Sequence, residues 1–81
     1  MAIVYIPAMW RDDFDGRREV AAEGATVGEV VESLEKIYPE IREKLTANVS
    51  IAVDGEVTPL GLLEDVDPDS EIHFVPAIRG G

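Results

Sequence analysis

The residues that could most readily take part in a reaction stand at the end of the sequence, where an apolar run is followed by Pro-Ala-Ile-Arg-Gly-Gly. Glycine side chains carry no chemistry, so we expect the functional group to be the α-carboxylate of Gly81, with Gly80 as its slender neighbour. Glycine lacks a Cβ and tolerates any required φ, which suits entry into a narrow channel. Ile78 and Arg79 belong to the same expected tail, residues 77–81. With the proline before it, this tail reaches roughly 20 Å when extended, far enough to enter another protein's active site.

A carboxylate of this kind needs activation before it can react. Its negative charge and poor leaving group oppose attack by nucleophiles, and adenylation with ATP is the simplest remedy. The chain has no Gly-rich phosphate loop. We therefore expect the chain to bind no cofactor itself and to present Gly81 to a separate activating enzyme that uses ATP.

Other chemical sites find little support in the sequence. The chain has no cysteine and a single histidine, His73, which excludes disulfides, thiolate metal sites and cysteine nucleophiles. His73 has no nucleophile near it in the sequence, as a general base would require. An EF-hand loop that started at Asp65 would need glycine at its sixth position and glutamate at its twelfth, where this chain has Ser70 and Pro76. We expect no catalytic residue and no metal site, and hence a co-substrate of the activating enzyme rather than an enzyme.

Length and charge narrow the classes of partner. The chain has 81 residues and a formal net charge of −10, which repels nucleic acid and anionic membranes and favours partners with a basic surface. Solubility or adaptation to salt is the alternative explanation of the acidity. The sequence shows no signal-peptide pattern and no apolar run long enough to span a membrane, so a cytoplasmic location is expected.

One amphipathic helix is expected to support the sheet that carries the tail. Thr26 and Glu29 form a capping-box pattern at its start, and the helix should run until Pro39 ends it. A short second helical turn is expected over residues 39–45. The apolar stripe of the main helix comprises Val27, Val30, Val31, Leu34, Ile37 and Tyr38.

Strands are expected on both sides of this helix. Alternation and β-branched residues predict them over residues 2–6, 17–22, 48–53, 56–57 and 71–75. Asp54-Gly55 predicts a type I′ hairpin turn, and a long, loose connection should join the first two strands. The order β-β-α-β-β-β predicts an α+β roll in residues 1–76, with one main helix packed on a mixed sheet of four to five strands.

The remaining apolar residues are assigned to the core of this roll. Ile72 and Phe74 should face the helix, with His73 opposite them. Trp10 should pack at the core or its rim, the alternative being an interface anchor. The residues expected to close the core from the irregular segment before the last strand are Leu60, Leu62, Leu63 and Val66.

The capped helix "TVGEVVESLEKIYPEIREKL", the hairpin "VSIAVDGEV" and the ending "SEIHFVPAIRGG" together resemble the ubiquitin-like sulfur-carrier family (ThiS/MoaD-like). This family is typified by the small subunit of molybdopterin synthase and the thiamine sulfur carrier. The resemblance covers nearly the whole chain and implies a β-grasp (ubiquitin-like) fold. It also implies that an E1-like adenylating enzyme activates Gly81, whose carboxylate becomes a thiocarboxylate that donates sulfur in biosynthesis. A sulfur carrier without cysteine can hold its sulfur only at that end.

The stretch after the first strand bears on the branch of the family. Pro7, Arg11 and Gly16 are similar to the proline, arginine and glycine of carriers that feed sulfur to cysteine synthesis, and the long helix-turn region differs from the compact thiamine carriers. We rank a cysteine-type or generic carrier first, a molybdopterin-type carrier second and a thiamine-type carrier third. The sulfur-accepting partner would then be a cysteine synthase-type enzyme or the large subunit of a molybdopterin synthase-type enzyme, of which this chain would be a non-catalytic subunit.

Two alternative functions remain open. The ending "IRGG" resembles the Leu-Arg-Gly-Gly end of ubiquitin, which implies a protein modifier whose Gly81 forms an amide with a target lysine. The other alternative is a plain interaction domain with an idle tail. In either active case the partner is expected to dock on a sheet surface beside the tail, formed by Tyr5, His73, Val75 and Pro76.

Overall fold

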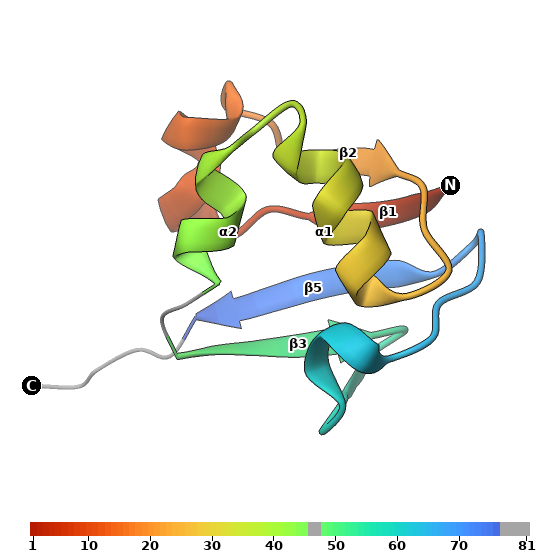
Figure 1. Cartoon of the computed structure of the whole chain (residues 1–81). Coiled ribbons are helices and arrows are strands. Elements are labelled where there is room, and N and C mark those ends of the chain that lie inside the picture. The colour runs from red at the N-terminus through yellow and green to blue at the C-terminus, as the bar shows by residue number, and fades with distance from the viewer. Residues whose placement is uncertain (46–47, 77–81) are drawn as a thin grey trace, which may run out of the picture.

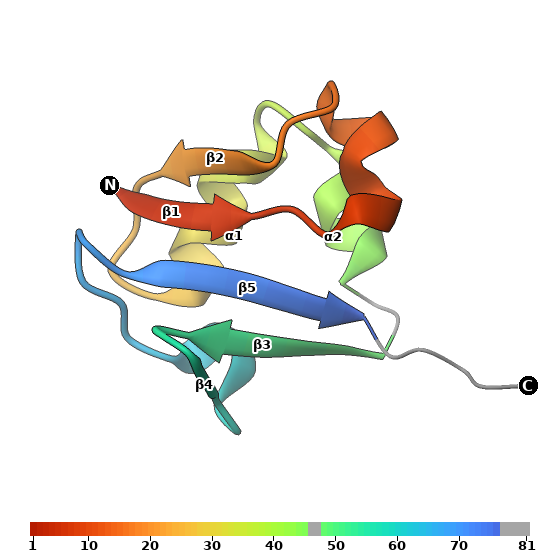
Figure 2. The same cartoon turned by 180° about the vertical axis from the view of Figure 1, so that it is seen from behind.

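Five strands form one mixed sheet in the computed structural model, which describes residues 1–45 and 48–76. The sheet order is β2-β1-β5-β3-β4, with β1 and β5 parallel and the other neighbouring pairs antiparallel. The long strands lie side by side in Figure 2. The bounds of the strands are β1 (Ala2–Tyr5), β2 (Glu19–Ala22), β3 (Val49–Val53), β4 (Glu56–Val57) and β5 (Glu71–Pro76).

Helices cover one face of this sheet and complete the expected α+β roll (Figure 1). The main helix is α1 (Val27–Glu35), followed by the short α2 (Glu40–Lys44). Two 3₁₀ segments, η1 (Ala8–Phe14) and η2 (Gly61–Leu63), lie in the connections. None of the helices within residues 1–45 and 48–76 is long and apolar enough to cross a bilayer.

The start of α1 confirms the capping prediction. The Thr26 hydroxyl accepts the Glu29 N–H at 3.2 Å, and the Glu29 carboxylate accepts the Ala25 N–H at 3.1 Å. The first bond satisfies an N–H group that would lack a partner in the first turn of the helix, and the second ties the residue before the N-cap to the helix. The four residues Val27, Val30, Val31 and Leu34 are fully buried, as their spacing predicts.

The end of α1 differs from the prediction. The helix stops at Glu35, and the N–H groups of Ile37 and Tyr38 both donate to the Leu34 carbonyl. This tighter turn leaves Ile37 63% exposed, so its assignment to the core was wrong, whereas Tyr38 is buried. Helical spacing predicts a residue's face only as far as the helix itself continues.

The connection between β1 and β2 is not the loose loop that the sequence predicted. It contains η1, which starts after Pro7 and buries two aromatic residues, Trp10 and Phe14. The ring centroids of Trp10 and Phe74 are 5.9 Å apart, and those of Phe14 and Tyr38 are 4.9 Å apart. The expected burial of Trp10 is confirmed, and Phe14 is a core residue that the prediction omitted.

The segment before β5 also corrects the predicted core. Leu60, Leu62 and Leu63 are 55%, 37% and 78% exposed, and Val66 is the member of the predicted set that is buried. The carbonyl of Leu62 lies so close to Gly28 that a Cβ there would be 3.1 Å from it. At this contact η2 presents both the carbonyl and the Cβ of Leu62 to α1, and Leu62 and Leu63 are nevertheless exposed.

Asp54 links the turn between β3 and β4 to the start of β5. Asp54 and Gly55 have φ values of 52° and 88°, as a type I′ hairpin requires. Asp54 also accepts bonds from the hydroxyl of the buried Ser70 at 3.1 Å and from the N–H of Glu71 at 2.9 Å. Ile72 and Phe74 then enter the core, as predicted.

Candidate functional site

The predicted tail follows β5, the central strand of the sheet. β5 ends at Pro76, which pairs with Val49 of β3. The calls on Ile78, Arg79, Gly80 and Gly81 lie outside the residues that the structure describes, so their roles stay predictions. The division of the chain into a domain of residues 1–76 and a tail of residues 77–81 stays a prediction for the same reason.

The open face of the sheet carries three of the four residues predicted to dock a partner. Tyr5 pairs with His73 across the parallel β1–β5 ladder, and side chains alternate along each strand, so both lie opposite the helices. Val75 follows two residues later on the same face and is 49% exposed. Pro76 follows two residues after Phe74 on the same strand and therefore lies on the helix side of β5. The structure brings Tyr5 and His73 together, and their role in docking stays a prediction.

Tyr5 and His73 form a stacked aromatic pair on this face. Their ring centroids are 4.3 Å apart and the ring planes differ by 1°. Partial burial, the negative charges of Glu71 and Glu19 and a hydrogen bond with Glu71 raise the pKa of Tyr5 above its usual value of 10.0. The phenol therefore stays neutral in the physiological range and can donate a hydrogen bond.

A pocket of about 710 Å³ opens beside the stacked pair. Its basic residues come from two stretches that the fold brings together at the end of β1. Arg11 was expected in the loose connection and Arg17 and Arg18 at the start of the second strand, and the pocket itself was not predicted. The signal available was the Arg17-Arg18 pair in an otherwise acidic chain. The pocket is lined by Tyr5, Ile6, Pro7, Arg11, Arg17, Arg18, Glu19 and His73.

Backbone contacts hold the two basic stretches of this pocket in place. The Arg11 Nε donates to the Ile6 carbonyl at 3.2 Å, and the Ile6 N–H donates to the Arg18 carbonyl at 2.8 Å. Gly16 has a φ of 71° and donates its N–H to the Arg11 carbonyl at 2.7 Å. Pro7 and Arg11, two of the three residues singled out for their family resemblance, line the pocket, and Gly16 lies just before Arg17 in the chain.

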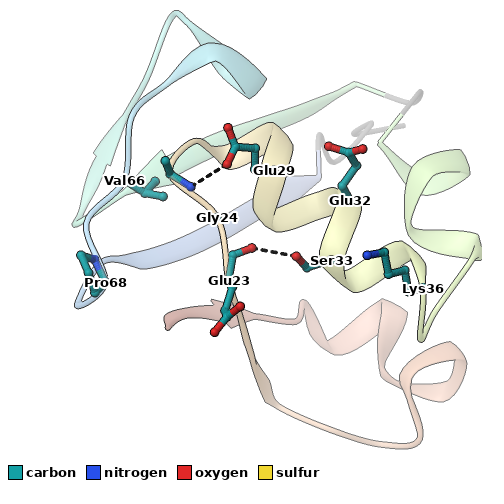
Figure 3. Close-up of a pocket in the computed structure, with 9 residues that line it drawn as sticks. Glu23, Gly24, Glu29, Glu32, Ser33, Lys36, Val66 and Pro68 are labelled. Atoms are coloured by element: carbon teal, nitrogen blue, oxygen red, sulfur yellow. Dashed lines mark hydrogen bonds between the residues drawn. The ribbon is translucent and has the colours of Figure 1, made fainter.

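A second hollow, of about 820 Å³, lies on the helix side and is predominantly acidic (Figure 3). Its carboxylates are those of Glu23, Glu29 and Glu32, with Lys36 as the basic residue. The Glu29 carboxylate and the Glu23 carbonyl accept hydrogen bonds from the Ala25 N–H and the Ser33 hydroxyl, which tie the chain before α1 to the helix. These interactions explain the local structure without a ligand.

The acidic turn before β5 also has a structural explanation. The Ser70 hydroxyl accepts the Asp67 N–H at 2.8 Å and donates to Asp54. In the described part of the chain, no group of three or more histidine, aspartate or glutamate side chains is placed to hold a metal ion.

Comparison with known proteins adds a family and three structural neighbours. Residues 9–81 match the ThiS family, and no curated protein matches the sequence significantly. A chain in the crystal structure of the BexX/CysO complex of Amycolatopsis orientalis is 27% identical, with a TM-score of 0.91 and 100% coverage of both chains. CysO of Mycobacterium tuberculosis, an antigen, is 28% identical, with a TM-score of 0.86 and coverage of 96% of this chain and 100% of that one.

The third neighbour is more distant in sequence. The solution structure of the small archaeal modifier protein 1 (SAMP1) of Methanosarcina acetivorans is 22% identical, with a TM-score of 0.81 and coverage of 99% of this chain and 95% of that one. At this identity the likeness shows a common fold. The three neighbours confirm the predicted ubiquitin-like architecture.

Proposed function

This chain belongs to the ThiS family of ubiquitin-like sulfur carriers, and on that premise we propose that its Gly81 carboxylate is the sulfur-carrying group. A separate enzyme adenylates the carboxylate, and a sulfur donor converts the adenylate to a thiocarboxylate that supplies sulfur for biosynthesis. The observation that carries this proposal is the family match over residues 9–81, which includes the Gly-Gly end.

The chemistry proceeds in two balanced steps. A carboxylate oxygen of Gly81 attacks the α-phosphorus of ATP, and pyrophosphate leaves. The sulfur nucleophile then attacks the carbonyl carbon, the acyl–oxygen bond to AMP breaks, and the thiocarboxylate remains. The chain has no cysteine to serve as the sulfur carrier, which supports placing the sulfur on the terminal carbonyl.

The body of the domain presents the tail and contacts the partner in this proposal. Gly80 and Gly81 enter the adenylating site because they lack Cβ atoms that would widen the chain. Tyr5, His73 and Val75 form the face that meets the activating enzyme beside the tail. The chain itself is a co-substrate, acts in the cytoplasm and binds no ATP.

The two CysO structures favour a cysteine-type carrier within this proposal. They share 27% and 28% of their residues with this chain and match it over nearly its whole length. The A. orientalis structure contains BexX together with CysO, which supports a carrier that docks on another protein. We propose that the sulfur acceptor is an enzyme of the cysteine synthase type.

A protein modifier is the second candidate function. It is favoured by the Ile-Arg-Gly-Gly ending, and the fold shared with SAMP1 is compatible with it. Both functions begin with the same adenylate and diverge when either a sulfur donor or a lysine amine attacks the carbonyl.

Intact-mass spectrometry tests the proposal directly. The full chain is incubated with its activating enzyme, Mg-ATP and sulfide, with a reaction that lacks ATP as control. A mass increase equal to the difference between one sulfur and one oxygen atom is expected, and it should be absent after deletion of Gly81. Gly81→Ala should keep the parent's melting temperature but give less product. Lysine-linked adducts in cells without any thiocarboxylate would favour the modifier, and sulfur incorporation that survives deletion of Gly81 would refute both functions.

A further inference from the structure

The pocket beside Tyr5 and His73 concentrates positive charge in an acidic protein. Three of the seven lysine and arginine residues of the chain, Arg11, Arg17 and Arg18, line it, although the net charge is −10. Glu19 is the one carboxylate in its lining. We call this feature the arginine pocket, defined by the three arginines with Tyr5, His73 and Glu19.

The guanidinium groups of Arg17 and Arg18 are not neutralised by the domain itself. Neither forms an ion pair with any residue in the described ranges, and both are exposed. Arg42 and Lys44, in contrast, pair with Glu35 at 3.2 Å and Asp13 at 2.6 Å. Charge at the arginine pocket is therefore available to a ligand.

The pocket is also partly organised before any ligand arrives. Arg11 is half-buried and held through its Nε by the Ile6 carbonyl, which leaves its terminal nitrogens as donors. The rings of Tyr5 and His73 are parallel, with centroids 4.3 Å apart, and the stacked pair adds a flat aromatic surface to the pocket. A site with fixed donors loses less conformational freedom on binding than one assembled from mobile side chains.

We propose that the arginine pocket binds an acidic segment of a protein partner. Arginine forks bind carboxylates through paired, charge-assisted hydrogen bonds, and the Tyr5–His73 pair offers contact area for the apolar stem of an acidic side chain. The pocket adjoins the predicted docking face, so the inference rests on the proposed function and specifies one feature of the partner. A protein that engages this carrier should carry a cluster of carboxylates opposite the pocket.

The surroundings of the pocket disfavour a nucleic acid or membrane as the ligand. The exposed residues Asp12, Asp13 and Asp15 lie in and just after η1, between Arg11 and Arg17 in the chain. An extended polyanion that covered the pocket would also face these carboxylates and the remaining negative charge of the domain. A short acidic peptide segment can enter the pocket without covering them.

Titration of the isotopically labelled full chain with a blocked tetraglutamate peptide tests the inference by NMR. At low ionic strength, where surface charges are least screened, saturable shifts are expected in the amides of Tyr5, Arg17, Arg18 and Glu19. The double variant Arg17→Glu/Arg18→Glu should weaken binding by about tenfold or more, because it replaces two attractive charges by two charges that repel the peptide.

The matched control reverses two charges elsewhere on the protein. Lys36→Glu/Arg42→Glu changes the net charge equally but lies on the helix side, so its affinity should fall by about threefold at most. Melting temperatures of both variants verify folding. Equal loss of affinity in the two variants, or shifts spread evenly over the surface, would overturn the proposal.

Inorganic phosphate provides the competing ligand. Phosphate that saturates the same amides more tightly than the peptide would assign the pocket to phosphate and overturn the peptide assignment. The titration requires no ATP, no activating enzyme and no reaction at Gly81. A negative titration would therefore overturn the assignment of the arginine pocket without bearing on thiocarboxylate formation at Gly81.

Discussion

Leu34→Ala and Leu63→Ala form a matched pair that tests how the structure corrects the predicted core. Both leucines were assigned to the core from the sequence, but Leu34 is 0% exposed and Leu63 is 78% exposed. Truncation of a fully buried leucine costs about 3 kcal/mol or more, because apolar contacts are lost and a cavity remains. Truncation of an exposed leucine should change the free energy of unfolding by about 0.5 kcal/mol or less.

The size of the domain makes this difference easy to measure. A domain of this length has a total stability of roughly 4–12 kcal/mol, so Leu34→Ala removes a substantial fraction. With an unfolding entropy of about 2.1 cal/mol/K per residue, a loss of 3 kcal/mol lowers the melting temperature by about 18 °C. Leu63→Ala should lower it by about 3 °C or less.

Urea unfolding followed by tryptophan fluorescence is the assay. Trp10 is the single tryptophan and is 7% exposed against Phe74, so its emission should report loss of the core. Unchanged m-values would show that the variants unfold like the parent. Equal losses for Leu34→Ala and Leu63→Ala would mean that η2 closes the core after all, and a loss below about 1 kcal/mol for Leu34→Ala would contradict its packing.

Three further perturbations test contacts elsewhere in the fold. Gly24→Ala should cost roughly 1–3 kcal/mol in a thermal melt, because its Cβ would lie 2.5 Å from a backbone nitrogen of α1; a change below about 0.5 kcal/mol would contradict that contact. Ser70→Ala should cost about 1–3 kcal/mol in urea, because it leaves the Asp67 N–H without its 2.8 Å partner, and parent-like stability would contradict this role. The raised pKa of Tyr5 means that the folded protein holds the phenolic proton more tightly than the unfolded chain, so the free energy of unfolding should fall as pH rises above about 10. Carbon NMR of the Tyr5 ring should show this titration, and Glu71→Gln should lower its midpoint; an unchanged midpoint would exclude Glu71 as a cause.

Local patterns predicted the regular elements because neighbouring residues determine them. The capping pair Thr26 and Glu29 and the helical spacing from Val27 to Leu34 specify α1 without reference to the rest of the chain. Asp54-Gly55 specifies its hairpin because both positions need positive φ. The order of these elements predicted the mixed sheet and the α+β roll, and the resemblance to sulfur carriers implied the ubiquitin-like fold.

The predictions that proved wrong concern apolar residues outside the α-helices and strands that the structure forms. Ile37 and Leu63 are apolar, but hydrophobic character alone does not determine which side of a turn faces the core. Phe14 lies among aspartates, and its burial depends on the 3₁₀ segment that seats it against Tyr38. Such placements require knowledge of which surfaces meet.

By itself, the sequence determined the fold class, the resemblance to sulfur carriers and the expectation that Gly81 carries the reacting group, because each depends on local pattern or composition. Only the tertiary structure decided that Tyr5 and His73 stack and that Arg11 joins Arg17 and Arg18 around one pocket. Tyr5 and His73 are far apart in the chain and meet through the parallel β1–β5 ladder, and the arginines meet where η1 and the chain before β2 close against the end of β1. Long-range pairing, which no local pattern encodes, therefore created the surface to which we assign partner binding.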